Sequence, residues 1–205
     1  MLNFLNDIKK LKNIADLGLF YAKDPFDRER YAELRDICLK MMSQLSDTPV
    51  STWDNFFAPV ADYPTPKVDI RALVLNEKNE ILLVQESADA NWSLPGGWAD
   101  IGLTAKEVAA KEVFEETGLT VSPTRLLAVF DKKCHPHPLQ AYYVYKFVIF
   151  CEQISGKLTP AHDILDVRYF PLNTLPPLSK NRILKSQIEL VFQKVLNEDF
   201  STYFD

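Results

Sequence analysis

Cysteine is scarce in this sequence, and long apolar runs are missing. The 205 residues include three cysteines, Cys38, Cys134 and Cys151, which are widely spaced and form no CxxC pair. This pattern gives no disulfide framework and predicts a reducing compartment, the cytoplasm. Charged residues interrupt the apolar N-terminus before a signal-peptide core develops, and no run approaches the roughly 20 apolar residues of a membrane span. We therefore expect a cytoplasmic protein with no membrane partner.

The sequence also lacks an excess of positive charge. Its 23 lysines and arginines are outnumbered by 28 aspartates and glutamates, which gives a net charge of −5. This balance disfavours the phosphate backbone of long nucleic acids, including sequence-independent binding of RNA. A small anionic ligand is still compatible, because a divalent cation can reverse the charge of a site locally.

Apolar periodicity and proline content divide the first third of the sequence into two parts. Residues 1–46 predict a helical domain of two helices, the second of which begins at Asp24-Pro25, a capping residue followed by proline at the first helical position. Two amphipathic helices cannot bury both apolar faces alone, so docking onto the rest of the chain or onto a second copy is expected. Residues 47–66 predict a linker with anchoring aromatics and a short helix at 52–58.

Residues 67–205 predict an α/β domain. The β-rich segments are Val68–Leu75, Ile81–Gln85, Leu126–Lys133, Gln140–Cys151 and Val167–Phe170. One helix is expected over residues 104–117 and another from about residue 180 to 197. Strands that are interrupted by one helix and closed by another predict an α/β sandwich around a mixed sheet.

Glycine is rare but concentrated. Four of the six glycines fall within 23 positions, and they are Gly96, Gly97, Gly102 and Gly118. Glycine serves forced turns and close backbone approach to ligands, so this segment is predicted to shape a site. Thr104 and Glu107 form a capping box that predicts the start of the following helix, and Gly118 stands just after its predicted end.

The same helix carries three glutamates on one face. At 100° per residue, Glu112, Glu115 and Glu116 fall within an arc of about 100°. Lys111 gives Glu107 and Glu115 an ordinary partner four residues away, whereas Glu112 and Glu116 have none and repel each other by roughly 0.2–0.5 kcal/mol. Closely spaced carboxylates without nearby bases suit a hard divalent ion. A solvated acidic face is the alternative interpretation, and the Pro-Gly-Gly loop just before the helix disfavours it.

The stretch from Gly97 to Leu119 resembles the Nudix box, G-x5-E-x7-R-E-U-x-E-E-x-G-U, in which U is aliphatic. The matching positions are Gly97, Glu112, Val113, Glu115, Glu116, Gly118 and Leu119, and the usual lead-in is present as Leu94-Pro95-Gly96. Leu103 stands where the first glutamate of the motif is expected, and Lys111 where the arginine is expected. In the family these two positions often interact, so a paired loss leaves the scaffold intact but removes one carboxylate that has been proposed as the base. The resemblance covers roughly residues 67–198 and implies a Nudix-type α/β/α sandwich with a small N-terminal helical domain.

The resemblance implies metal-assisted attack of water on one phosphorus of a nucleoside diphosphate linked to a group X. It implies that Glu112, Glu115 and Glu116 are the catalytic residues and, with the Gly96 carbonyl, the metal ligands. Mg²⁺ is the expected cofactor, with Mn²⁺ as the alternative. Glu112 is the first choice for the general base, and a carboxylate from a distant loop is the other candidate.

A second cluster of polar residues connects two predicted strands and reads Asp131-Lys132-Lys133-Cys134-His135-Pro136-His137-Pro138. A zinc site is disfavoured because the sequence holds no second pair of ligands. Exposed loop histidines are the ordinary interpretation. The functional interpretation places Asp131, Lys132, His135 and His137 at the edge of the active site, in contact with phosphates or base, and adds Trp98, which follows the glycine pair.

The whole arrangement resembles a Nudix subgroup of Gram-positive bacteria with a helical N-terminal extension, which includes enzymes acting on CDP-choline and ADP-ribose. It implies a homodimer that involves the N-terminal helices, and a small nucleotide as substrate. The first hypothesis is hydrolysis of CDP-choline to CMP and phosphocholine. The alternatives are an ADP-ribose or nucleotide-sugar pyrophosphatase, an enzyme that cleaves RNA ends or nucleoside triphosphates, and a catalytically silent nucleotide sensor. A choline cage would use aromatic rings, and the candidates, which core packing also explains, are Trp53, Phe56, Phe57, Trp98 and Tyr142.

Overall fold

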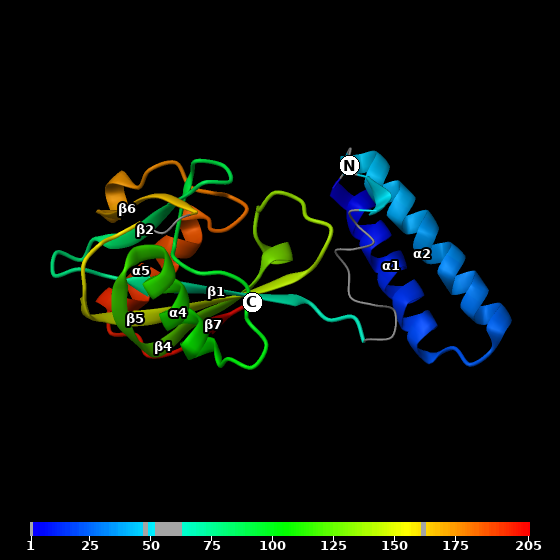
Figure 1. The fold of residues 1–205 in the computed structure, drawn as a ribbon, viewed down its shortest axis with the longest axis horizontal. Helices are drawn as coiled ribbons and strands as arrows, with labels where there is room; N and C mark the ends of the chain where they lie inside the picture. Colours follow the sequence, from blue (N-terminus) through cyan, green and yellow to red (C-terminus); the bar gives the residue numbers. More distant parts are fainter. Residues whose placement is uncertain (1, 47–48, 52–62, 161–162) are drawn as a thin grey trace. The chain divides into compact units, whose positions relative to one another are not determined.

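A computed structural model describes residues 2–46, 49–51, 63–160 and 163–205 (Figure 1). The contacts of the chain divide it into two units. The first comprises Met1–Pro66 and Leu139–Tyr142, and the second comprises Lys67–Pro138 and Tyr143–Asp205. Each unit has its own buried core, so each is described by itself.

The first unit is built on two packed helices, α1 (Leu2–Tyr21) and α2 (Pro25–Ser46). The predicted restart at Asp24-Pro25 is confirmed, because the Asp24 carboxylate accepts hydrogen bonds from the backbone N–H groups of Phe26 (2.8 Å) and Asp27 (3.2 Å). Such a side-chain cap satisfies donors that the first helical turn leaves without partners. Sequence and structure therefore agree on where α2 begins.

The core of the first unit is small, with buried side chains at Ile8, Cys38, Leu39, Met42 and Ala141. Other apolar side chains of α1 are exposed in this chain, and they are Phe4, Leu11, Ile14, Phe20 and Tyr21. In the described part of the chain, no helix is both long and apolar enough to cross a membrane. The predicted helix at 52–58 and the candidate cage residues Trp53, Phe56 and Phe57 lie outside the described residues.

Within the described residues, the second unit contains two sheets, ordered β1-β5-β4-β7 and β3-β2-β6. Their strands are β1 (Lys67–Val74), β2 (Ile81–Glu86), β3 (Trp92–Ser93), β4 (Leu119–Asp131), β5 (Val144–Gly156), β6 (Ile164–Phe170) and β7 (Tyr203–Phe204). β1 pairs with β5 in parallel and β7 with β4 in parallel, whereas β4–β5, β2–β3 and β2–β6 are antiparallel. The sheet that contains β1 is therefore mixed, as predicted.

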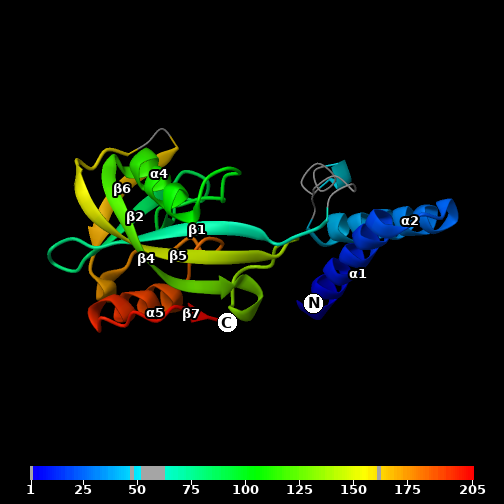
Figure 2. The same cartoon turned by 90° about the horizontal axis from the view of Figure 1, so that it is seen from below.

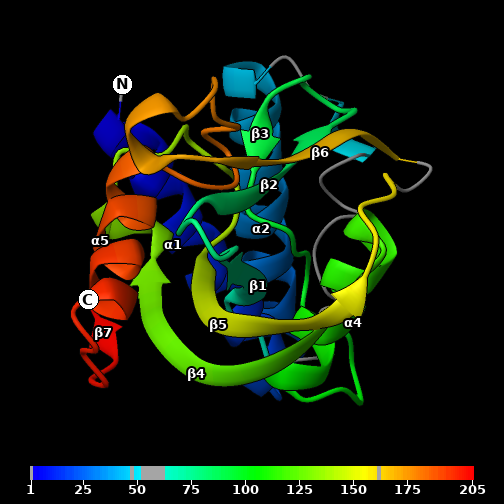
Figure 3. The same cartoon turned by 90° about the vertical axis from the view of Figure 1, so that its left-hand side faces the viewer.

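Two helices cover the strands from opposite sides (Figures 2 and 3). They are α4 (Ala105–Thr117) and α5 (Lys185–Leu196), and two short 3-10 helices, η1 (Lys132–Cys134) and η2 (Leu172–Thr174), lie in the loops. One apolar core includes Ile70 and Val113 and lies under α4, and the other includes Phe130 and Ile188 and lies under α5. The expected α/β/α class is confirmed.

The boundaries of some elements differ from prediction. β4 begins at Leu119 rather than Leu126, because the pairing register shifts around Pro123 and so accommodates a residue that ordinarily argues against a strand. The predicted strand from Gln140 begins only at Val144, and Lys132 and Lys133 belong to η1 rather than to a strand. The two-residue strands β3 and β7 were not predicted, because two residues show no alternation.

Candidate active site

The Pro-Gly-Gly loop lies directly against β1. The Ile70 N–H donates to the Gly97 carbonyl and the Ala72 N–H to the Pro95 carbonyl, both at 2.8 Å. Gly96 has a φ of +142°, and a Cβ atom added there would lie 2.0 Å from the Ile70 carbonyl oxygen. No other residue can adopt this conformation so close to the strand. The clustered glycines therefore do shape a tight loop.

Helix α4 begins and ends where the sequence predicts. The Thr104 side chain accepts a hydrogen bond from the Glu107 N–H (3.2 Å), and the Glu107 carboxylate accepts one from the Thr104 N–H (2.7 Å). Gly118 takes the left-handed conformation, with a φ of +73°, at the C-terminus. Glu107 thus acts as a cap and not as the partner expected for Lys111. These two caps fix the register in which the glutamates of α4 face the glycine loop.

Two of the three glutamates meet the loop. Glu116 Oε2 accepts a hydrogen bond from the Gly96 N–H at 2.9 Å, and its side chain is almost buried. The Glu112 carboxylate lies so close to the next glycine that a Cβ atom on Gly97 would be 2.7 Å from Glu112 Oε1. Glu115 instead forms an exposed ion pair with Lys111 at 3.3 Å, so its ordinary structural interpretation is confirmed.

Burial leaves these two carboxylates short of compensating charge. It raises the pKa of Glu116 to about 8, an effect that Arg71 and the Gly96 N–H oppose and that Glu86 and Glu112 increase. Burial likewise raises the pKa of Glu112, against the opposing charges of Lys111 and Arg71.

The donor set fits a hard divalent cation, which would supply the positive charge that the chain does not. Across the described ranges, no group of three or more His, Cys, Asp or Glu side chains is placed to hold a metal ion. The fit to a divalent cation therefore depends on the carboxylates of Glu112 and Glu116 and on the backbone of the Gly96–Gly97 loop.

The loop and α4 are joined by a residue that the sequence analysis did not single out. Lys111 Nζ lies 2.9 Å from Asp100 Oδ2, in an exposed ion pair. Leu103, three positions later in the loop, is exposed. Asp100 therefore provides the acidic partner that the motif would place at position 103. The motif does not specify an acidic residue at position 100, so the sequence showed the charge of Asp100 but not its role.

A buried network of charges next to the loop was also missed. On β1, Arg71 lies 3.1 Å from Asp69. Arg71 also donates a hydrogen bond, at 3.0 Å, to the carbonyl of Leu94, which stands just before Pro95 and the glycine pair. Lys146, on the neighbouring strand β5, is fully buried and donates to the same aspartate. Burial lowers the pKa of Lys146 to about 8, and Asp69 opposes that change. One buried carboxylate thus has two cationic partners beneath the glycine loop.

Glu86 extends this network to the segment before α5. Arg182 Nε lies 2.8 Å from Glu86 Oε1, which also accepts a hydrogen bond from the Ser93 hydroxyl at 2.7 Å. Arg71 lies 3.8 Å from the same oxygen. A signal for the network existed in the sequence, since Asp69 and Arg71 alternate with apolar residues and so share one face of a buried strand.

The predicted substrate-binding loop is held by the segment before α5. Lys132 Nζ donates to the Asn181 carbonyl, and His137 Nδ1 contacts the Lys180 carbonyl, both at 2.7 Å. Asp131 caps η1 by accepting from the Lys133 N–H at 3.1 Å. These residues therefore come together with the segment at 180–182.

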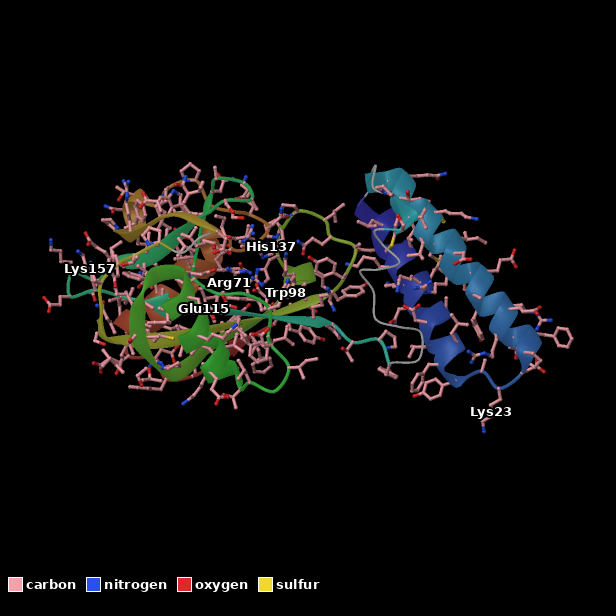
Figure 4. All side chains as sticks on the ribbon, viewed as in Figure 1. Lys23, Arg71, Trp98, Glu115, His137 and Lys157 are labelled. Carbon is pink, nitrogen blue, oxygen red and sulfur yellow. The ribbon has the colours of Figure 1, made fainter. Side chains whose placement is uncertain are left out.

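His135 and Trp98 have different surroundings. His135 Nε2 lies 3.0 Å from Asp205 Oδ2, next to β7. Trp98 is about half exposed, with the Lys67 ammonium 5.4 Å from its ring centroid. Figure 4 labels Trp98, Arg71, Glu115 and His137, which come from the glycine loop, β1, α4 and the loop after η1. Arg71 interacts electrostatically with Glu116, and Lys146 with both Arg71 and His137, so the buried network connects the two parts of the site.

Two family models match the chain. One, described as a NUDIX domain, matches residues 65–191, and the other, described as a UDP-X-like, N-terminal oligomerisation domain, matches residues 3–57. A Bacillus subtilis (strain 168) protein, provisionally named an ADP-ribose pyrophosphatase, is 40% identical over 202 residues, which cover 98% of this chain and 97% of that protein.

Two crystal structures are similar to the chain. One is of a UDP-X diphosphatase, whose sequence is 36% identical. The match covers 99% of this chain and 98% of that chain, with a TM-score of 0.64. The other, of an ADP-ribose pyrophosphatase from Streptococcus suis 89-1591, is 38% identical and covers 69% of this chain and 100% of that chain, with a TM-score of 0.62.

Proposed function

The chain belongs to the Nudix hydrolase family, and on that premise we propose that it hydrolyses the pyrophosphate bond of a nucleoside diphosphate linked to a sugar, ADP-ribose first of all. The observation that carries this proposal is the pair Glu112 and Glu116 at the Gly96–Gly97 loop. The names of the similar proteins support ADP-ribose and UDP-linked substrates. Hydrolysis of CDP-choline, the first choice from the sequence, stays a prediction.

Glu112, Glu116 and the Gly96 carbonyl are the proposed metal ligands, with Glu115 acting directly or through water. Nudix hydrolases generally use divalent metal ions, and Mg²⁺ is proposed here because all these donors are oxygen atoms. Such an ion would neutralise phosphate oxygens and lower the pKa of a bound water. The fixed contact between the Gly96 N–H and Glu116 (2.9 Å) supports this assignment, because it holds one carboxylate against the loop.

Glu112 is the proposed general base. Leu103 carries no carboxylate, and Asp100, the nearest acid in the loop, is engaged by Lys111. Glu112 lies beside the glycine loop and, unlike Glu116, accepts no hydrogen bond from Gly96. A base must reach the proton that it removes, and this position satisfies that requirement better than the exposed Glu115 does.

We also propose that residues 1–46 form an assembly domain, residues 47–66 a linker, and residues 67–205 the hydrolase domain of a homodimer. The exposed apolar side chains of α1 and the match to an oligomerisation model support this proposal. Sedimentation equilibrium at micromolar concentration is expected to give twice the mass of the chain. A single species of 23.5 kDa would remove the dimer.

A hydrolysis panel with Mg²⁺ tests the substrate. It contains ADP-ribose, UDP-glucose, CDP-choline, a dinucleoside polyphosphate and nucleoside triphosphates, and its products are identified by mass spectrometry. We expect ADP-ribose to give AMP and ribose 5-phosphate, and a chelator to abolish the reaction. Failure to cleave any nucleoside diphosphate derivative, with either Mg²⁺ or Mn²⁺, would refute the proposed function.

A further inference from the structure

The ring of His137 is held in one tautomer. Its Nδ1 atom lies 2.7 Å from the Lys180 carbonyl oxygen. A carbonyl oxygen can only accept, so Nδ1 carries the hydrogen and donates it. In a neutral imidazole the other nitrogen then has a bare lone pair, and His137 Nε2 is an acceptor.

The same ring is uncharged near neutral pH. Burial lowers the pKa of His137 to about 4; the Lys180 carbonyl opposes this, whereas Lys132, Lys146 and His135 lower it further. A neutral histidine surrounded by lysines cannot serve as a cation for phosphate. Contact of this histidine with a phosphate group is therefore disfavoured, and contact with a neutral group of the substrate is favoured.

His137 Nε2 is buried and, among the residues that the structure describes, has no hydrogen-bond partner. Leaving a buried acceptor unsatisfied costs about 1–3 kcal/mol. Native proteins satisfy nearly all such atoms, so an orphaned acceptor on a fixed ring marks a place where a donor from elsewhere fits.

The loop around His137 keeps this acceptor in place. The His137 N–H donates to the His135 carbonyl at 2.8 Å, and the His135 ring is held by Asp205. Asp205 also accepts a hydrogen bond from the Asp131 N–H at 2.7 Å, so the residue that follows β7 is joined to the η1 loop at two points. An acceptor held in this way is preorganised for a ligand.

We propose that His137 Nε2 is a subsite for the substrate, where it accepts a hydrogen bond from a neutral O–H or N–H donor. The inference rests on the proposed function and extends it. A ribose hydroxyl and an amino or imide group of the base share this chemistry. In either case the subsite determines affinity and selectivity, while hydrolysis takes place at Glu112 and Glu116.

Two substitutions separate the acceptor from the loop anchor. His137→Asn keeps an N–H group that can reach the Lys180 carbonyl but has no acceptor at the position of Nε2. His137→Gln places its amide oxygen near that position and restores an acceptor. We expect His137→Asn to raise KM for ADP-ribose about tenfold with kcat nearly unchanged, the loss of one net hydrogen bond, and His137→Gln to recover part of it. An unchanged KM in His137→Asn would overturn the proposal.

NMR of protein labelled with ¹⁵N-histidine gives a readout that needs no turnover. At neutral pH we expect a protonated Nδ1 and a bare Nε2 for His137, and we expect saturating AMP, UMP or ribose 5-phosphate to shift the Nε2 signal. A shift with ribose 5-phosphate indicates a hydroxyl donor, and a shift with only one of AMP and UMP, which share the ribose hydroxyls, indicates a base donor. A protonated Nε2, or a signal unmoved while other resonances saturate, would refute the subsite. If wild type cleaved no substrate in the panel, the proposed function would fail, and this experiment would still decide the role of His137.

Discussion

Two carboxylates in the same unit, Asp69 on β1 and Glu116 on α4, are almost equally buried, at 5% and 9% exposure. Burial would raise the pKa of Asp69, but Arg71 and Lys146 outweigh it and the pKa falls. Burial raises the pKa of Glu116 to about 8, because Arg71 and one N–H group do not balance it. The buried network is neutralised from within the chain, whereas the acidic face of α4 is not.

This difference distinguishes a carboxylate with a structural role from a carboxylate that is suited to bind a metal ion. A carboxylate with two cationic partners is already satisfied and acts as part of the core, where breaking the set is costly. A carboxylate with too little compensation is suited to a cation from solution. Substitutions in each region, and in ion pairs outside both, test whether the two regions differ in this way.

The largest effect is expected from Glu116→Gln. If this residue is a ligand for Mg²⁺, its loss removes several kcal/mol of charge stabilisation, so activity should fall by about three orders of magnitude. The fold should be unchanged by circular dichroism, and Glu189→Gln, at a half-exposed glutamate of α5, is the control. Full activity in Glu116→Gln would remove this residue from the metal site.

Arg71→Met tests the buried network. It takes one cationic partner from Asp69 and Glu86, which keep only Lys146 and Arg182 as cationic partners, and breaking a buried pair in this way costs up to about 3–5 kcal/mol. Urea denaturation should show the loss, while Lys185→Met, which removes one end of an exposed pair on α5, should leave the midpoint almost unchanged. Equal midpoints in the two variants would contradict the distinction between the regions.

Asp205→Asn is expected to have a moderate effect that depends on pH. Burial would raise the pKa of Asp205, but hydrogen bonds from the Asp131 N–H, His135 and Tyr203 lower it below its ordinary 3.8. A depressed pKa contributes stability above that ordinary value, and this contribution disappears as pH falls through the folded-state pKa. The free energy of unfolding of wild type should exceed that of the variant by about 1 kcal/mol at pH 6, and the difference should shrink as the pH falls below 3.8. Thermal melts over this pH range would measure the difference, and a difference that does not change with pH would contradict a role for the Asp205 carboxylate.

The smallest effect is expected from Asp100→Asn. The pair of Asp100 and Lys111 is exposed, and exposed pairs contribute little to stability. Activity should stay within about twofold of wild type, because Glu112 and Glu116 are positioned by the glycine loop rather than by this pair. A large loss of kcat in steady-state assays would show instead that Asp100 positions the loop for catalysis.

The parts of the fold that could be predicted are those set by neighbouring residues. The capping box at Thr104, the end at Gly118 and the start of α2 all depend on contacts within a few positions. The β-rich composition of Val68–Leu75 likewise predicted a strand. Pro123 concealed the first half of β4, because the local signal argued against a strand that long-range pairing imposes.

The parts of the site that could not be predicted depend on distant residues. Asp69 meets Lys146 only because β1 and β5 pair in parallel in the register that places them opposite each other. The tautomer of His137 depends on the carbonyl of Lys180, on the far side of β5 and β6 in the sequence. The pair of Glu115 and Lys111, in contrast, is four residues apart in one helix and was expected from the sequence. Tertiary pairing decided the first two.

Gly97 has no side chain, and this leaves room for the side chain of Glu112. The carboxylate of Glu112 occupies the space that a methyl group at this position would need. Because that carboxylate is the end of a flexible side chain, alanine here would displace it and leave the backbone where it is. A change of one carbon atom, without any change of charge, is therefore a means of moving the proposed base.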